Sequence, residues 1–216
     1  FTVLTSLGAK ERLALSFRHM NDDPQNHIRV IPPLLRREVT LHEPYSGDYI
    51  HGYMVNAGFS ENVMKWHRQH PRIPLRFFWD KWEEEPVKRV DNTLSFYQLD
   101  DVEFLRQMAG CKAYASTAGF ESVCEAMYLG KPILMVPAHI EQDCNAYDAE
   151  KSGAGIISSD FNLQQLLEFA KDYHPNRDFV YWVRGAEYTL LNLLESDSSN
   201  YQQVLFNEMY LVEEFI

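Results

Sequence analysis

The chain has 216 residues, of which 31 are acidic and 20 are basic, so its formal net charge is −11. This length suits one large domain or one and a half small ones, and the negative balance argues against non-specific binding to nucleic acid or to an anionic membrane surface. Three cysteines without a C-x-x-C pair indicate neither a disulfide framework nor a zinc site, and they favour a cytoplasmic location.

The first part of the chain has little pattern of its own. Residues 1–30 contain a short strand candidate and a turn-rich stretch, and we expect them to be a linker or the remnant of a preceding lobe. Pro32 and Pro33 then stiffen the chain as it enters a new domain. Arg36 and Arg37 follow, and we expect them to form a surface pair near a hinge; the alternative is that they steer an anionic ligand.

Between residues 31 and 178, strand candidates alternate with helix candidates. The strand candidates are 49–55, 74–79, 93–99, 112–116, 132–137 and 153–159. The helix candidates are 60–70, 101–111, 121–130, 142–152 and 162–173. This alternation predicts an α/β fold with a doubly wound parallel sheet of the Rossmann type.

Capping residues and charge mark the remaining boundaries. Ser60 and either Asp100 or Asp101 precede helical patterns, and we expect them to cap those helices. The charged stretch 80–92 is predicted to be a loop, and the acidic, aromatic stretch 179–216 is predicted to be a helical tail.

The stretch from Ser116 to Ala146 is the most informative for function. In a doubly wound sheet, ligands bind at the carboxyl ends of the strands, where helix N-termini direct their amides outward. Ala118 and Gly119 supply a tight turn between a strand and a helix. The amides of the three residues after Gly119 would therefore be available to a phosphate group.

Ser122 and Glu125 lie three residues apart, on about the same face of the predicted helix. The carboxylate of Glu125 can accept two hydrogen bonds from a vicinal diol such as that of ribose, and this arrangement suits a nucleotide. The same S-x-x-E spacing is also that of a helix capping box, in which Glu125 would bond to the amide of Ser122. Both interpretations are open at this point.

The longer stretch resembles the donor-binding signature of GT-B glycosyltransferases, in particular the branch of MurG-like enzymes and UDP-glycosyltransferases. In that family a small-residue turn is followed by S/T-x-x-E-A-x-x-x-G-x-P, then by an apolar strand that ends in proline, and then by D/E-Q-x-x-N-A. The matching segments here are SVCEAMYLGKP at 122–132, VP at 136–137 and EQDCNA at 141–146.

The resemblance implies how a nucleotide-sugar donor is held at this stretch. Glu125 matches the glutamate that binds the ribose hydroxyls. Gly119, Phe120, Glu121 and Ser122 match the turn and helix start that hold the diphosphate. Because Glu121 is negatively charged, we expect its side chain to point away from a bound phosphate.

Further donor contacts are implied by the same resemblance. Glu141 and Gln142 match the acidic residue and glutamine that bond to hydroxyls of the donor sugar. Gln98 and Leu99 occupy the place where the nucleobase is held. Gly58 belongs to a loop that faces the sugar and phosphate from the opposite side.

The implied activity is that of the donor-binding half of an inverting glycosyltransferase, which transfers a hexosyl group from a nucleotide sugar. The sequence contains no D-x-D motif of the kind that metal-dependent glycosyltransferases carry. Retaining GT-B enzymes carry E-x7-E in this region, but here Leu129 and Ile133 stand eight positions after Glu121 and Glu125, so that pattern is absent from this stretch. We therefore expect neither a metal nor another cofactor. UDP is the favoured nucleotide, and GDP and dTDP are open.

The acceptor site and the catalytic base are expected in an N-terminal lobe. Because the chain starts with Phe1, we expect that lobe to precede it; the alternatives are a separate donor-binding subunit completed by a partner chain, and a lobe of a sugar-nucleotide epimerase. The tail is expected to cross onto the missing lobe or to support self-association. Peripheral membrane association of the full-length enzyme is open. The apolar residues of this tail are Tyr210, Leu211, Val212 and Phe215.

Overall fold

The structure, a computed structural model, describes residues 6–81 and 85–195. The chain divides into two compact units, one of Leu35–Val180 and one that combines Phe1–Leu34 with Tyr181–Ile216. The domain boundaries predicted near residues 30 and 178 stay predictions. The predicted apolar tail residues, Tyr210, Leu211, Val212 and Phe215, lie outside the described residues.

The smaller unit contains a two-stranded parallel sheet. Its strands are β1 (Arg12–Leu15) and β2 (Ile28–Ile31), which pair residue for residue from Arg12 opposite Ile28. Residues 186–195 of this unit are helical and follow α8 (Arg177–Arg184) along the chain. Within the described residues, no helix combines the length and the apolar character needed to cross a bilayer.

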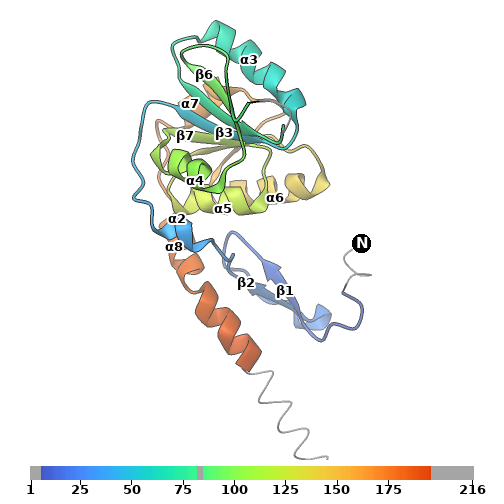
Figure 1. Ribbon diagram of the computed structural model, residues 1–216. Helices are drawn as coiled ribbons and strands as arrows, with labels where there is room; N and C mark the ends of the chain where they lie inside the picture. Colours follow the sequence, from blue (N-terminus) through green and yellow to red (C-terminus); the bar gives the residue numbers. More distant parts are fainter. Residues whose placement is uncertain (1–5, 82–84, 196–216) are drawn as a thin grey trace, which may run out of the picture. The chain divides into compact units, whose positions relative to one another are not determined.

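The larger unit is built on a mixed sheet with helices on both faces (Figure 1). The strands are β3 (Ile50–Met54), β4 (Leu75–Trp79), β5 (Val87–Arg89), β6 (Leu94–Gln98), β7 (Ala113–Ser116), β8 (Ile133–Met135) and β9 (Gly155–Ile157). The helices are α2 (Arg37–Thr40), α3 (Ser60–Gln69), α4 (Asp101–Gly110), α5 (Phe120–Tyr128), α6 (Ile140–Lys151) and α7 (Leu163–Phe169).

The helices bury both faces of this sheet. Val63 of α3 and Leu163 of α7 join one core cluster with Phe77 and other residues of the strands. On the opposite face, the ring of Phe104 from α4 lies edge-on to the ring of His51 from β3. These contacts confirm the prediction of an α/β fold whose parallel strands are covered by helices on both sides.

The strands are arranged so that the winding of the sheet reverses at its centre. Their order is β5-β6-β4-β3-β7-β8-β9. Counted from β3, the parallel strands follow the Rossmann order 3-2-1-4-5-6, and the reversal falls between the neighbours β3 and β7. The helices that follow these two strands, α3 and α5, leave on opposite faces. A crevice therefore opens at the carboxyl ends of β3 and β7.

Three local predictions can be compared directly with the structure. The prediction that 80–92 is wholly a loop was wrong, because β5 pairs antiparallel with β6 and adds a short, exposed edge to the sheet. Ser60 is the first residue of α3 rather than its cap. Asp100 is a cap as predicted, since its carboxylate accepts a hydrogen bond from the amide of Glu103 at 2.8 Å.

β9 packs closely against β8 at Gly155, and a substitution there tests how much this packing contributes to stability. A Cβ atom added there would overlap the carbonyl oxygen of Ile133 and lie 2.7 Å from its carbonyl carbon, and neither backbone atom can move without disturbing the strand pair. We expect Gly155→Ala to lower the free energy of unfolding by about 1–3 kcal/mol, measured by urea denaturation.

Gly119→Ala is the matched control for this prediction. A Cβ atom at Gly119 would meet only the hydroxyl of Ser122, at 3.6 Å, so its free energy of unfolding should change by less than about 0.5 kcal/mol. Equal stability of the two variants would contradict the packing argument.

Candidate functional site

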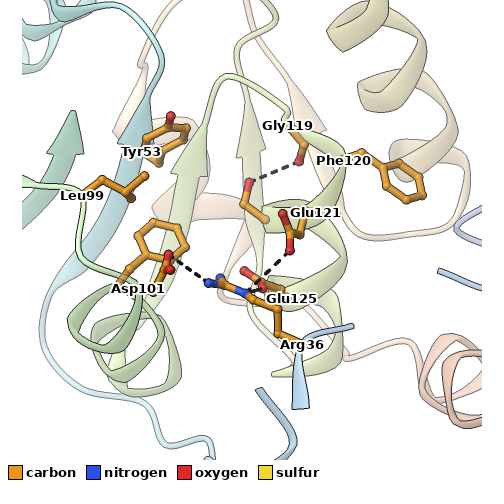
Figure 2. Close-up of a pocket in the computed structure, with 10 residues that line it drawn as sticks. Arg36, Tyr53, Leu99, Asp101, Gly119, Phe120, Glu121 and Glu125 are labelled. Carbon is orange, nitrogen blue, oxygen red and sulfur yellow. Dashed lines mark hydrogen bonds and ion pairs between the residues drawn. The ribbon is translucent and has the colours of Figure 1, made fainter. Parts of the chain in front are cut away.

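A pocket of about 250 Å³ lies at the reversal point of the sheet. Its walls come from the ends of β3 and β6, from the start of α4, and from the turn and helix that follow β7 (Figure 2). The lining residues are Arg36, Tyr53, Leu99, Asp101, Phe104, Gly119, Phe120, Glu121, Ser122 and Glu125. Six of the residues predicted from the sequence are thus brought together, namely Leu99, Gly119, Phe120, Glu121, Ser122 and Glu125.

The turn before α5 is held in a conformation that few residues adopt. Ala118 has a φ of 61°, in the left-handed region, and its amide donates a hydrogen bond to the hydroxyl of Ser116 at 3.2 Å. Asn145 of α6 donates a second hydrogen bond, from its side-chain amide to the carbonyl of Ala118 at 3.3 Å. The turn is therefore fixed from two sides.

The N-terminus of α5 opens into the pocket. Gly119 occupies the cap position, and among the described residues no side chain caps the helix. The first intrahelical bond runs from the amide of Val123 to the carbonyl of Gly119, so the amides of Glu121 and Ser122 precede it. The hydroxyl of Ser122 donates to the carbonyl of Gly119 at 3.2 Å. This end of the helix carries partial positive charge that suits an anion.

Glu125 is the most deeply buried charged group of the pocket. Its side chain is 1% exposed, and its Oε1 accepts a hydrogen bond from Nε of Arg36 at 2.7 Å. Its Oε2 is also buried and has no hydrogen-bond partner in the described part of the chain. The capping box does not form, because the carboxylate bonds to Arg36 and not to the amide of Ser122.

Burial controls the ionisation of this carboxyl. Desolvation raises the pKa of Glu125 above its ordinary value, and the hydrogen bond and positive charge of Arg36 oppose that shift without cancelling it. The pKa of Arg36 is raised in turn, chiefly by the hydrogen bond to Glu125.

Arg36 connects three carboxylates across the pocket, as Figure 2 shows. Besides Glu125, its guanidinium lies 3.1 Å from Oδ1 of Asp101 and 3.7 Å from Oε1 of Glu121. The predicted surface pair of Arg36 and Arg37 was therefore wrong for Arg36, which is half-buried, whereas Arg37 is exposed. No local pattern indicates this contact, because Arg36 and Glu125 lie 89 positions apart in the chain.

The other predicted donor residues lie outside the pocket lining. Gly58 is exposed, and its amide donates to the side chain of Asn56 at 2.8 Å. The amide of Gln98 donates to the carbonyl of Pro86 as part of the edge pairing. Their contacts with a donor stay predictions.

The predicted sugar-binding pair, Glu141 and Gln142, divides between two environments at the start of α6. Glu141 is exposed, whereas Gln142 is buried and its side-chain oxygen accepts a hydrogen bond from the amide of Ala138 at 2.8 Å. In the structure, Gln142 thus closes the turn that leads into α6. The contact of either residue with a sugar is still a prediction. Asn145 gains a structural role that the motif did not indicate.

The comparisons with known proteins agree with this architecture. A family model described as glycosyl transferase family 1 matches residues 8–173. A Caenorhabditis elegans protein described as a UDP-glucuronosyltransferase, ugt-48, is 26% identical over 105 residues, which make up 48% of this chain and 20% of that protein.

Two solved structures share the fold. The glycotransferase of kitacinnamycin matches with a TM-score of 0.61 at 14% identity, over 87% of this chain and 55% of that one. The calicheamicin glycosyltransferase CalG4 matches with a TM-score of 0.57 at 13% identity, over 79% of this chain and 48% of that one. The chain thus spans about half the length of these structures and a fifth of the Caenorhabditis elegans protein.

The buried carboxylate should make stability depend on pH in a defined direction. Because the folded-state pKa of Glu125 lies above the ordinary value of 4.5, its contribution to stability is fully present below that pH and is lost as the pH rises through the folded pKa. Glu125→Gln should therefore unfold at higher urea concentration than the wild type at pH 7, and the difference should shrink as the pH falls toward 4.

Glu150→Gln on the exposed face of α6 is the control for this series, and it should change the free energy of unfolding by less than about 0.5 kcal/mol at every pH. A Glu125→Gln protein that is less stable than the wild type at pH 7 would show that the pair with Arg36 outweighs desolvation.

Proposed function

This chain belongs to glycosyl transferase family 1, and we propose that it forms the half of such an enzyme that binds the nucleotide-sugar donor. The observation that carries the proposal is the buried Oε2 of Glu125, which has no hydrogen-bond partner in residues 6–81 and 85–195 and lies beside the open N-terminus of α5. A carboxylate oxygen that is removed from water without a hydrogen bond costs free energy, and a donor hydroxyl would supply the missing bond.

The proposed donor lies across the pocket in two parts. The ribose diol bonds to Glu125, and the diphosphate lies against the amides at the start of α5, where the helix dipole favours negative charge. Leu99, at the end of β6, lines the side of the pocket where the nucleobase would rest.

Arg36 is the group that makes a diphosphate acceptable here. Three carboxylates share this one guanidinium, so the pocket carries a net negative charge. A diphosphate would be repelled by that charge unless a cation faced it. We propose that Arg36 pairs with the diphosphate when the donor binds, while the ribose hydroxyls take its place on Glu125.

The proposed reaction is a direct displacement with inversion. An acceptor hydroxyl attacks the anomeric carbon of the hexosyl group, the bond from that carbon to the diphosphate oxygen breaks, and the nucleoside diphosphate leaves with the electron pair. The proton of the hydroxyl passes to a base. The start of α5 and Arg36 stabilise the charge on the departing diphosphate, so the proposal requires no metal ion.

The acceptor site and the base are proposed to lie outside this sequence. The chain spans about half of the solved structures that it resembles, and the pocket residues include no histidine. A lobe of the same protein or a partner chain would complete the enzyme. UDP is the first nucleotide to test, since the Caenorhabditis elegans relative is described as a UDP-glucuronosyltransferase.

Calorimetric titration with UDP, GDP and dTDP tests the donor site. We expect one of them to bind, and we expect Glu125→Gln to weaken that binding by about 10- to 100-fold, because a hydrogen bond to a charged acceptor contributes roughly 1.5–3 kcal/mol. Glu150→Gln should bind as the wild type does, and EDTA should change nothing. No binding by any of the three, or an unaltered affinity in Glu125→Gln, would refute the assignment.

The role of Arg36 is tested by comparing UDP with uridine. Arg36→Met should weaken the binding of UDP by about tenfold, which corresponds to roughly 1.4 kcal/mol for one phosphate contact. The affinity for uridine should stay the same or increase, because Glu125 no longer pairs with Arg36. Arg37→Met is the matched control, since Arg37 is the exposed neighbour. Equal losses for UDP and uridine would show that Arg36 only supports the fold of the pocket.

A further inference from the structure

A second pocket, of about 480 Å³, lies at the amino-terminal ends of the strands of the same sheet, opposite to the carboxyl ends where the first pocket lies. It is formed where β7 and β8 begin and where α5 ends, whereas the donor pocket lies where β3 ends and α5 begins. The two sites are therefore separated by the length of the strands, and nothing in the proposed donor chemistry involves the second one.

The end of α5 explains how a lysine comes to be buried in this pocket. Gly130 has a φ of 67°, and the amides of Gly130 and Lys131 donate to the carbonyls of Met127 and Ala126, which is the Schellman arrangement of a helix end. Pro132 follows and begins the extended chain. This turn directs the side chain of Lys131 inward, where the residue is only 4% exposed.

Among the described residues, the ammonium of Lys131 is held by neutral groups alone. Its Nζ donates to the carbonyls of Tyr45 at 2.7 Å and Cys111 at 3.0 Å. No carboxylate in residues 6–81 or 85–195 forms an ion pair with it, and its third N–H has no acceptor there. Buried charges are ordinarily paired, because desolvation penalises the lone ion. That penalty is the main reason why the pKa of Lys131 is lowered.

The rest of the pocket also lacks negative charge. None of its lining residues is acidic, although the chain as a whole carries a net charge of −11. Lys112 adds a second, exposed cation at the rim. Tyr173 contributes a buried hydroxyl that has no hydrogen-bond partner among the described residues, and burial raises its pKa to about 12. The hydroxyl is thus protonated and available as a donor at neutral pH.

The carbonyl groups at the end of α5 do not make the pocket negative. A helix C-terminus carries partial negative charge when its last carbonyls are unpaired. Here the carbonyls of Glu125, Ala126 and Met127 accept from the amides of the following turn. The local charge is therefore set mainly by the lysine.

We propose that this pocket binds a small organic anion, with a carboxylate or phosphate head group on an apolar ring. The head group would pair with Lys131 and accept a hydrogen bond from Tyr173, and the ring would lie against the apolar wall that includes the side chain of Tyr128. The observation that carries the proposal is a buried cation that has no counter-ion among the described residues and lines a cavity together with Tyr173, whose hydroxyl is unsatisfied there as well.

An NMR titration of the full chain tests the proposal with benzoate and phenyl phosphate as probes and benzamide as the uncharged control. At least one of the two anions is expected to cause saturable chemical-shift changes at the backbone amides of Lys112, Gly130 and Lys131. Benzamide is expected to cause none. The preferred probe identifies the head group. The amides of Gly119 and Ser122 report separately on the donor pocket, so phenyl phosphate that binds there is recognised as such.

Two variants separate binding from folding. Tyr173→Phe removes a hydroxyl that makes no hydrogen bond within the described part of the chain, so this protein should fold as well as the wild type while binding the preferred anion about three- to tenfold more weakly. Lys131→Met should weaken the binding of the preferred anion by at least about tenfold. The proposal is overturned if neither anion shifts these amides at millimolar concentration, if benzamide shifts them equally, or if Tyr173→Phe binds as the wild type does.

Discussion

Between β3 and β7 the parallel sheet reverses its direction of winding, and the helices that follow these two strands depart on opposite faces. Such a reversal leaves a crevice with room for a ligand at the carboxyl ends of the two strands, and the pocket of about 250 Å³ lies there. The turn after β7 and the first turn of α5 lie at this crevice, and the end of β3 and the start of α4 complete its walls. Every proposed contact with a donor depends on that reversal.

The crevice contains three carboxylates and one guanidinium, so negative charge is in excess. Glu125 is withdrawn from water, Arg36 bonds to one of its two oxygens, and the other has no partner in the part of the chain that the structure describes. A site arranged for stability alone would have a neutral residue at Glu125, because the desolvation of this carboxyl is the larger effect on its pKa. The cost is understandable if the carboxylate is kept for a ligand that supplies the remaining hydrogen bonds. Arg36 then acts as the counter-ion in the empty pocket and as a phosphate ligand in the filled one.

One helix contributes to both proposed sites, and its two ends are built differently. The N-terminus of α5 begins with Gly119, has no side-chain cap among the described residues and opens into the proposed donor pocket. The C-terminus closes on itself through Gly130, which uses up the last carbonyls and directs Lys131 into the second pocket. Anion binding is therefore favoured at the first end by the backbone and at the second end by a side chain.

The sequence alone determined what depends on neighbours along the chain. The alternation of strands and helices and the cap at Asp100 follow from local periodicity and turn chemistry, and they sufficed for the fold class. The family and six residues of the pocket came from the resemblance of the sequence to a known donor-binding signature. Only the tertiary structure decided that β5 pairs at the sheet edge and that Asn145 holds the turn at Ala118. It also decided that Arg36, 89 positions from Glu125, completes the pocket. These contacts join segments whose separation in sequence carries no periodic signal, because they are set by strand order and by the burial of charge.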